Sequence, residues 1–96
     1  MHYYVAIVED RGPASAIWLW FPDLPGCFSA GDTIDEAMAN APEAIAAYAE
    51  ALAENGGDLP KARSLAELKS DARFVEEISG NMVALVTAPP MAVAAE

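Results

Sequence analysis

The chain has 96 residues, which is enough for one domain with a single modest core. Fifteen acidic residues against five basic ones give a formal net charge of -10, and so few Lys and Arg side chains argue against direct nucleic-acid binding by this chain. The acidity favours a basic protein partner, for example a protein that itself binds nucleic acid.

The N-terminal third is predicted to form three strands. Residues 2–10 alternate in a way that places Tyr3, Val5 and Ile7 on one face and Tyr4, Ala6 and Val8 on the other. Gly12 and Pro13 mark a turn, and residues 15–21 read as a second strand that pairs with the first as a hairpin. Residues 27–30 are long enough for a short third strand.

The second strand leaves two interpretations open for its tryptophans. Trp18 and Trp20 project to one side, opposite Ile17, Leu19 and Phe21. Either the tryptophans pack under the long helix that follows, or the aliphatic side does. In the second case the tryptophans lie on a face covered partly by residues 64–79 and partly by a partner, since large aromatic side chains are typical interface anchors.

A long helix is predicted to begin near Thr33, where Thr33 and Glu36 have the spacing of a capping box. An apolar stripe then recurs at helical spacing as far as Leu52, and Asn55 with the glycines after it supplies a stop. Pro42 interrupts the pattern, because it cannot donate to the carbonyl four residues earlier. Since the stripe keeps its phase across Pro42, we expect one kinked helix rather than a second helix capped by Asn40.

The C-terminal part is predicted to add a short helix, one or two helical turns and a last strand. Ser64 and Glu67 form another capping box, residues 73–78 can form helical turns that end at Gly80, and residues 81–88 alternate as a strand. The order is therefore β-β-β-α-(α)-β, an α+β domain. Both faces of its sheet are apolar and one major helix covers one face, so we expect a homo-oligomer, either a dimer or a tetramer.

The residues that carry most enzymatic chemistry are scarce in this chain. Cys27 is the only cysteine, which excludes an internal disulfide and fits a reducing compartment. Its acidic neighbourhood favours a buried apolar role over a nucleophile. Gly26 and Gly31 match neither the phosphate-binding loop nor the dinucleotide fingerprint. We expect no cofactor.

The turn acids are the one alternative that would make the chain an enzyme. Glu9, Asp10, Asp23 and Asp32 could in principle form the two-metal site of a divalent-metal nuclease or small hydrolase. Acidic residues are also the ordinary choice at turns and helix caps. The turn interpretation is therefore preferred.

The expected cellular compartment follows from two features that the sequence lacks. The N-terminus lacks the basic flank and the long apolar run of a signal peptide. No stretch approaches the roughly 18 apolar residues that a membrane helix needs. We expect a cytoplasmic protein that makes no membrane contact.

The run FPDLPGCFSAGDTIDEA at residues 21–37 closely resembles the HicB family of antitoxins, as do LPKARSLAELKSD and the late strand NMVALV. The resemblance implies a partial ribonuclease-H-like domain over residues 1–88, with one mixed sheet packed on a long helix. It also implies that residues 89–96 form a tail or linker, and that the C-terminal DNA-binding module with which HicB proteins repress their own operon is absent from this chain.

In the family this domain binds and neutralises HicA, a small basic toxin that cleaves messenger RNA. The resemblance therefore predicts an antitoxin without enzymatic activity that covers the RNA-binding surface of a HicA-like toxin. From charge and expected exposure, we predict that the contacts come from the sheet, the acidic loop and the outer face of the long helix: Trp18, Trp20, Asp23, Asp32, Glu43, Glu50 and Glu54.

Overall fold

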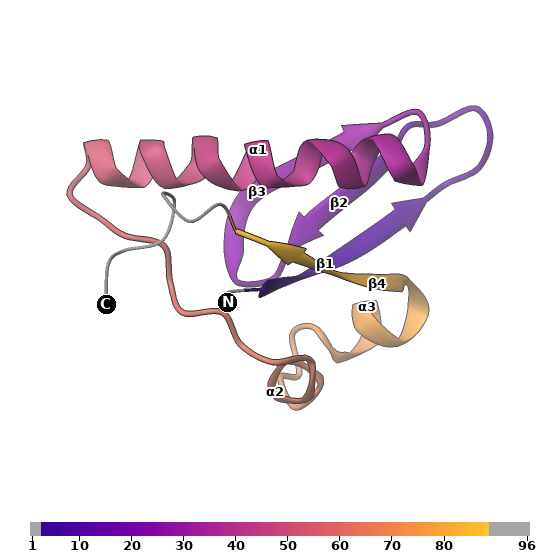
Figure 1. Cartoon of the computed structure of the whole chain (residues 1–96). Helices are drawn as coiled ribbons and strands as arrows, with labels where there is room; N and C mark the ends of the chain where they lie inside the picture. The colour runs from indigo at the N-terminus through magenta and orange to yellow at the C-terminus, as the bar shows by residue number, and fades with distance from the viewer. Residues whose placement is uncertain (1–2, 89–96) are drawn as a thin grey trace.

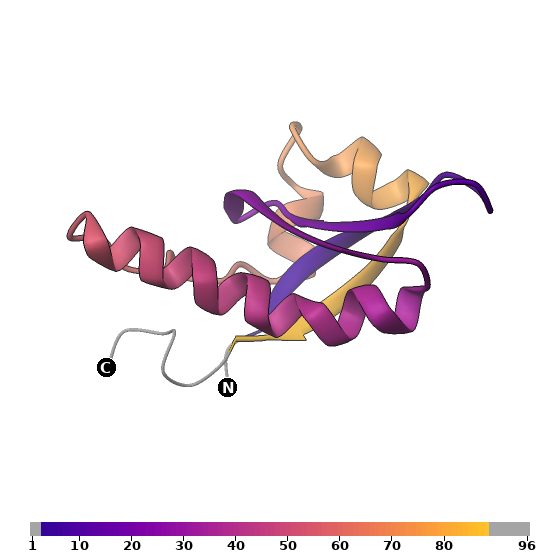
Figure 2. The same ribbon diagram turned by 90° about the horizontal axis from the view of Figure 1, so that it is seen from above.

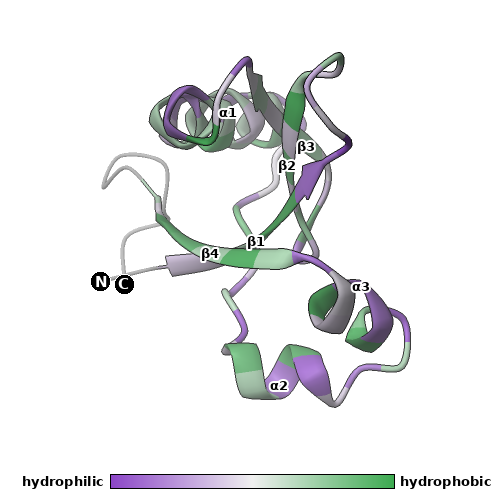
Figure 3. Cartoon of the chain, turned by 90° about the vertical axis from the view of Figure 1, so that its right-hand side faces the viewer, coloured by the Kyte–Doolittle hydropathy of each residue, from purple (hydrophilic) through white to green (hydrophobic). Residues whose placement is uncertain are grey.

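The computed structural model describes residues 3–88 and consists of three layers. A single sheet contains β1 (Tyr3–Asp10), β2 (Ile17–Phe21), β3 (Leu24–Gly31) and β4 (Met82–Thr87). The long helix α1 (Ile34–Glu54) covers one face, and the short helices α2 (Leu65–Lys69) and α3 (Val75–Gly80) cover part of the other (Figure 1, Figure 3). The predicted α+β order is confirmed, while the predicted tail at 89–96 lies outside the described residues.

The sheet has the order β3-β2-β1-β4, and every pairing in it is antiparallel. The prediction of a mixed sheet was therefore wrong. A loop of residues 11–16 joins β1 to β2, a tight turn at Pro22 and Asp23 joins β2 to β3, and the chain returns after α3 to run β4 against β1. The predicted hairpin of the first two strands is confirmed, and β4 lies beside β1.

The third strand is longer than the predicted segment 27–30. It begins at Leu24, because Pro22 and Asp23 form a turn of only two residues after β2. A register shift between Trp20 and Phe21 absorbs the extra residues of β3. Gly26 lies within this irregular part at φ 85, a backbone conformation that favours glycine.

The helix α1 begins and ends where the capping signals predict. The Thr33 side chain accepts a hydrogen bond from the Glu36 amide, and Asn55 is the C-terminal cap. The Glu36 carboxylate accepts from the amide of Asp32, one residue earlier than in a standard capping box. α1 is one helix through Pro42, as predicted, and the Asn40 side chain donates to the carbonyl of Ala30 instead of capping a new helix.

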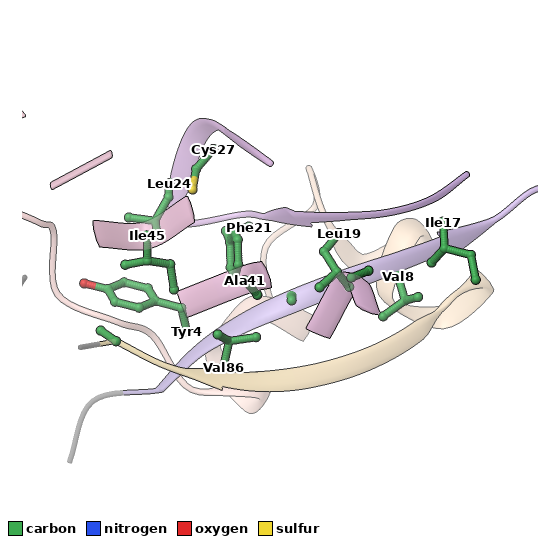
Figure 4. Packing of buried hydrophobic residues seen from close by; sticks show 13 residues of the cluster. Tyr4, Val8, Ile17, Leu19, Phe21, Leu24, Cys27, Ala41, Ile45 and Val86 are labelled. Atoms are coloured by element: carbon green, nitrogen blue, oxygen red, sulfur yellow. The ribbon is translucent and has the colours of Figure 1, made fainter. Parts of the chain in front are cut away.

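The main core lies between the sheet and α1 (Figure 2, Figure 4). Ile17, Leu19 and Phe21 all point into it, which decides between the two interpretations of the second strand. Ala37, Ala41 and Ile45 of α1 are fully buried against them, and the small alanines let the helix lie close to the sheet. The tryptophans therefore lie on the opposite face of the sheet.

A smaller core lies between the sheet and the two short helices. Val5 and Ile7 of β1 pack there against Leu68 of α2 and Ile78 of α3. The second capping box is confirmed, because the Ser64 side chain accepts from the Glu67 amide and the Glu67 carboxylate accepts from the Ser64 amide. This layer covers β1 and leaves much of β2 and β3 without a helix.

Candidate functional site

The uncovered part of the sheet carries an aromatic patch, Trp18 and Phe28. Trp18 is 46% exposed and Phe28 is 60% exposed, and their rings meet edge to face at 6.1 Å. Large aromatic side chains that lie together on an exposed surface are typical of a site where a partner binds. The patch is thus a candidate contact surface.

Trp20 lies next to the patch but is held inside the protein. Its ring packs against Phe74, and its indole nitrogen donates to the Glu9 carboxylate at 2.6 Å. Hydrogen bonds from Arg11 and from Trp20 lower the pKa of Glu9 below its ordinary value. A hollow of about 250 Å³ lies beside Trp20, and Pro22, Pro25, Phe28 and Phe74 are among the residues that line it.

Asp23 is bound within the chain by Arg63. Its carboxylate accepts from the Arg63 amide at 2.8 Å and from the Arg63 guanidinium at 2.7 Å, and only 7% of its side chain is exposed. Arg63 also reaches Asp71 at 3.1 Å, and Asp71 in turn pairs with Arg73. Asp23 therefore anchors the segment that leads into α2, forty residues further along the chain.

Sequence reasoning missed this network of Asp23, Arg63, Asp71 and Arg73. Both guanidinium groups also lie over the Phe74 ring, at 5.9 Å and 5.1 Å. The pKa of Asp71 is held well below its ordinary value by hydrogen bonds from Arg73 and then from Arg63. The sequence does place four of its five basic residues between positions 61 and 73. Their spacing, however, does not indicate which acidic residues they pair with.

The four turn acids of the nuclease alternative do not converge. Glu9 binds Arg11 and Trp20, Asp10 accepts from the Gly12 amide at 3.0 Å as a turn residue does, and Asp23 binds Arg63. Asp32 lies beside Asp10 along a shallow hollow at the hairpin end. Within residues 3–88, no group of three or more His, Cys, Asp or Glu residues could hold a metal ion.

Glu43, Glu50 and Glu54 all point outward from α1. Their spacing of seven and four residues places them on one stripe of the helix. None of the three is paired with a basic side chain among the described residues. The exposed positions between them include Ala47 and Ala51, so the stripe is flat as well as acidic.

The charges of the chain are segregated by layer. Residues 12–60, which contain β2, β3 and α1, hold eight acidic residues and no basic one. The acidic stripe of α1 and the aromatic patch lie on opposite faces of the sheet. The structure thus separates the predicted contact residues into two surfaces, with Asp23 belonging to neither.

Cys27 is buried under α1, as predicted for a small apolar side chain. Its thiol lies 3.6 Å from the carbonyl of Ala44, and burial raises its pKa to about 11. Because the thiolate is the reactive form, we expect native protein at pH 8 to react with iodoacetamide far more slowly than unfolded protein does. Equal rates with and without denaturant, measured by mass spectrometry, would contradict this burial.

Within residues 3–88, no helix has both the length and the apolar character that crossing a membrane requires.

Known proteins resemble this chain over most of its length. A protein of 14.9 kDa from Haemophilus phage HP1, encoded in the rep-hol intergenic region and uncharacterised, is 52% identical over 57 residues. That alignment covers 59% of this chain and 43% of the phage protein, so the match spans less than half of that relative.

Solved structures share the fold. The antitoxin HicB of Burkholderia pseudomallei superposes with a TM-score of 0.75 at 29% identity, over 98% of this chain and 68% of that one. A chain of the HicA3 and HicB3 toxin-antitoxin complex gives a TM-score of 0.70 at 31% identity, over 92% of this chain and 99% of that one. The model of the family described as the HicB_like antitoxin of bacterial toxin-antitoxin system matches residues 3–94. By that match, the chain belongs to the HicB-like family of antitoxins.

Proposed function

We propose that this chain neutralises a HicA-like, mRNA-cleaving toxin by docking the outward face of α1 onto the toxin's basic RNA-binding surface. The observation that carries the proposal is the segregation of charge, with eight acids and no base in residues 12–60. A surface of one sign attracts a partner of the other sign and speeds their encounter. A chain similar to this one occurs in a complex of HicA3 with HicB3, which supports a HicA-like toxin as the partner of this chain.

The acidic stripe has dimensions suited to cover such a surface. From Glu43 to Glu54 the helix rises about 16 Å, at 1.5 Å per residue. The alanines between the glutamates let a partner approach the helix closely. Bound there, the antitoxin presents carboxylates to the cationic groups that would otherwise hold RNA phosphates, so RNA is excluded from the toxin.

The remaining predicted contacts have different roles in this proposal. Asp32 lies exposed just before α1 and can extend the acidic surface. Asp23 acts indirectly, because its carboxylate holds Arg63. Trp18 and Trp20 lie across the sheet from the stripe, so one toxin would contact them only by reaching around the edge of the domain.

Charge reversal on α1 tests the proposal. In the variant Glu43→Lys/Glu50→Lys we expect the Kd for the toxin to rise by about tenfold or more, because like charges then oppose the basic surface. Both side chains are exposed and unpaired, so the free energy of unfolding should change by less than about 0.5 kcal/mol. Titration of purified toxin measures the Kd, and growth rescue in cells that express the toxin measures neutralisation.

The matched control is Glu76→Lys/Glu77→Lys on α3, which changes the net charge equally on the other face of the sheet. Its Kd should stay within about twofold of wild type. If both variants weaken binding alike, the effect is one of net charge and the docking face is elsewhere. If wild-type chain fails to co-purify with the toxin encoded beside it at micromolar concentration, the proposed function is wrong.

We further propose that the complete protein resides in the cytoplasm and represses its own operon through a C-terminal DNA-binding module beyond the described residues. The phage relative, of which the match covers 43%, supports a longer architecture. A nuclease function is disfavoured, since the chain belongs to an antitoxin family and its turn acids bind different partners within the chain.

A further inference from the structure

The C-terminal end of α1 is closed by a glycine motif. Asn55 is the C-terminal cap, and Gly56 follows it at φ 79, in the left-handed region that favours glycine. The Gly56 amide donates to the Ala53 carbonyl at 3.0 Å, and the Gly57 amide donates to the Leu52 carbonyl at 2.8 Å. The backbone at this end of the helix therefore favours glycine at position 56, directly after an asparagine.

The pair Asn55-Gly56 has a chemical property that the other two asparagines of the chain do not share. The side-chain amide of an asparagine can be attacked by the backbone nitrogen of the next residue, and the Cβ atom of that next residue hinders the attack. Gly56 has no Cβ atom, so its nitrogen is unhindered. Asn40 and Asn81 are each followed by a residue with a side chain. Asn55 is therefore the asparagine most open to this reaction.

We propose that Asn55 is a site of spontaneous covalent modification through a cyclic imide. The Gly56 nitrogen gives its proton to hydroxide or to a buffer base and bonds to Cγ of Asn55, while the Cγ–Nδ2 bond breaks and ammonia leaves. Water then opens the succinimide at either carbonyl. Opening at Cγ gives aspartate, and opening at the main-chain carbonyl gives isoaspartate, in which the chain continues through Cγ. The reaction consumes water, releases ammonia and involves no oxidation or reduction.

The folded structure sets the rate, because it holds the reacting groups in other contacts. The Asn55 side chain donates to the Ala51 carbonyl at 3.0 Å, and the Gly56 nitrogen donates to the Ala53 carbonyl. Both hydrogen bonds have to break before the nitrogen can reach Cγ. The reaction therefore proceeds in those molecules whose last helical turn is open.

The last turn of α1 opens readily for two reasons. The buried residues of α1 are Ala37, Ala41 and Ile45, and its C-terminal end projects past the sheet (Figure 1, Figure 2). A helix end with few buried contacts frays with a small free-energy cost. In addition, Glu54 places a negative charge at the negative end of the helix dipole, and the sequence of this turn, ALAE, contains no basic residue.

The modification weakens the helix end at which it forms. Either product carries a carboxylate next to Glu54 and no longer donates to the Ala51 carbonyl. Isoaspartate also lengthens the main chain by a methylene within the glycine motif. Because the hydrolysis is not reversed, modified chains accumulate with time and carry an additional negative charge at a loosened end of α1. The inference does not depend on the proposed function, since it concerns the reactivity of the chain itself.

Peptide mapping by mass spectrometry tests the site in the intact chain. During incubation at pH 8, the peptide that contains Asn55 should gain the mass of an amide-to-carboxylate change at least about tenfold faster than the peptides that contain Asn40 or Asn81. The rate should rise with pH, because the attacking nitrogen has to lose its proton, and should rise further in guanidinium chloride, which removes the helix. Equal conversion of Asn55 and Asn81 would refute the site. A native rate as fast as the unfolded rate would refute control by the last turn of α1.

Two variants at position 55 measure the consequence. Asn55→Asp has the side chain of one product, and we expect it to unfold a few degrees below Asn55→Gln at low salt, with a smaller difference at high salt. Asn55→Gln keeps an amide but needs a larger ring for the same attack, so it should stay unmodified through the same incubation. Conversion of Asn55→Gln as fast as wild type, or an Asn55→Asp variant as stable as Asn55→Gln, would overturn the inference.

Discussion

Replacing Asp23 by alanine is expected to lower the free energy of unfolding by about 3 kcal/mol. The Asp23 carboxylate accepts two hydrogen bonds from Arg63, one from the backbone amide and one from the guanidinium, and its side chain is almost completely buried. Without it the Arg63 amide loses its acceptor, and the guanidinium retains only Asp71. Chemical denaturation followed by circular dichroism measures the change.

The control for this substitution is Asp32→Ala, nine residues further along the chain, between the end of β3 and the start of α1. Asp32 is exposed, so its loss should change stability by less than about 0.5 kcal/mol. The double variant Asp23→Ala/Arg63→Ala should lose less than the sum of the two single losses, because the two residues act as one unit. Additive losses, or an Asp23→Ala variant as stable as wild type, would show that the ion pair does not anchor the segment before α2.

Replacing Gly31 by alanine is expected to destabilise the protein by about 2 to 3 kcal/mol. Gly31 ends β3 where the chain turns into α1. A Cβ atom there would lie 2.6 Å from the amide nitrogen of Ala37 and 2.8 Å from the Cβ of Glu36. These atoms belong to the first turn of α1 and cannot move without lifting the helix from the sheet. Thermal and chemical unfolding measure the loss.

Gly80 is the natural control, because nothing lies within 4 Å of a Cβ added there. It is the last residue of α3, and its replacement by alanine should leave stability unchanged or raise it by up to about 1 kcal/mol. If the two glycine variants behave alike, then the close approach of β3 and α1 does not constrain position 31. Retained toxin binding by a folded Gly31→Ala variant would also separate this packing role from docking.

These two positions show what the segment 21–37 does in an antitoxin of this family. Asp23 ties the turn after β2 to the layer of short helices, and Gly31 lets α1 begin directly against the sheet. Neither contributes chemistry. The segment is the corner that fixes the angle between sheet and helix, and so it determines where the acidic stripe of α1 points.

Local signals in the sequence were enough to predict most of the elements. The capping residues Thr33 and Ser64 mark where α1 and α2 begin, because a cap depends on residues three positions apart. Alternation in β1 predicted which of its side chains share a face, because this pattern also depends only on residues close together in the sequence. The sheet was nevertheless predicted as mixed, since the direction of β4 depends on how the chain returns after α3, and no local pattern encodes that path.

The candidate site was less predictable than the fold. Charge and helical spacing identified Glu43, Glu50 and Glu54 as one outward stripe, because exposure on a long amphipathic helix follows from its period. The same reasoning grouped Asp23 with them, although its carboxylate is used by an arginine forty residues away. It also placed Trp18 in one set with the glutamates, whereas the sheet lies between them.

The sequence by itself determined the acidic character of the chain, the position of most of its helices and strands, and the absence of basic residues from 12 to 60, because composition and short-range periodicity are local properties. Only the tertiary structure decided which acids are bound by arginines within the chain and which face of β2 is covered by α1. Those outcomes depend on contacts between residues far apart in the chain, and such contacts exist only once the sheet and α1 have packed together.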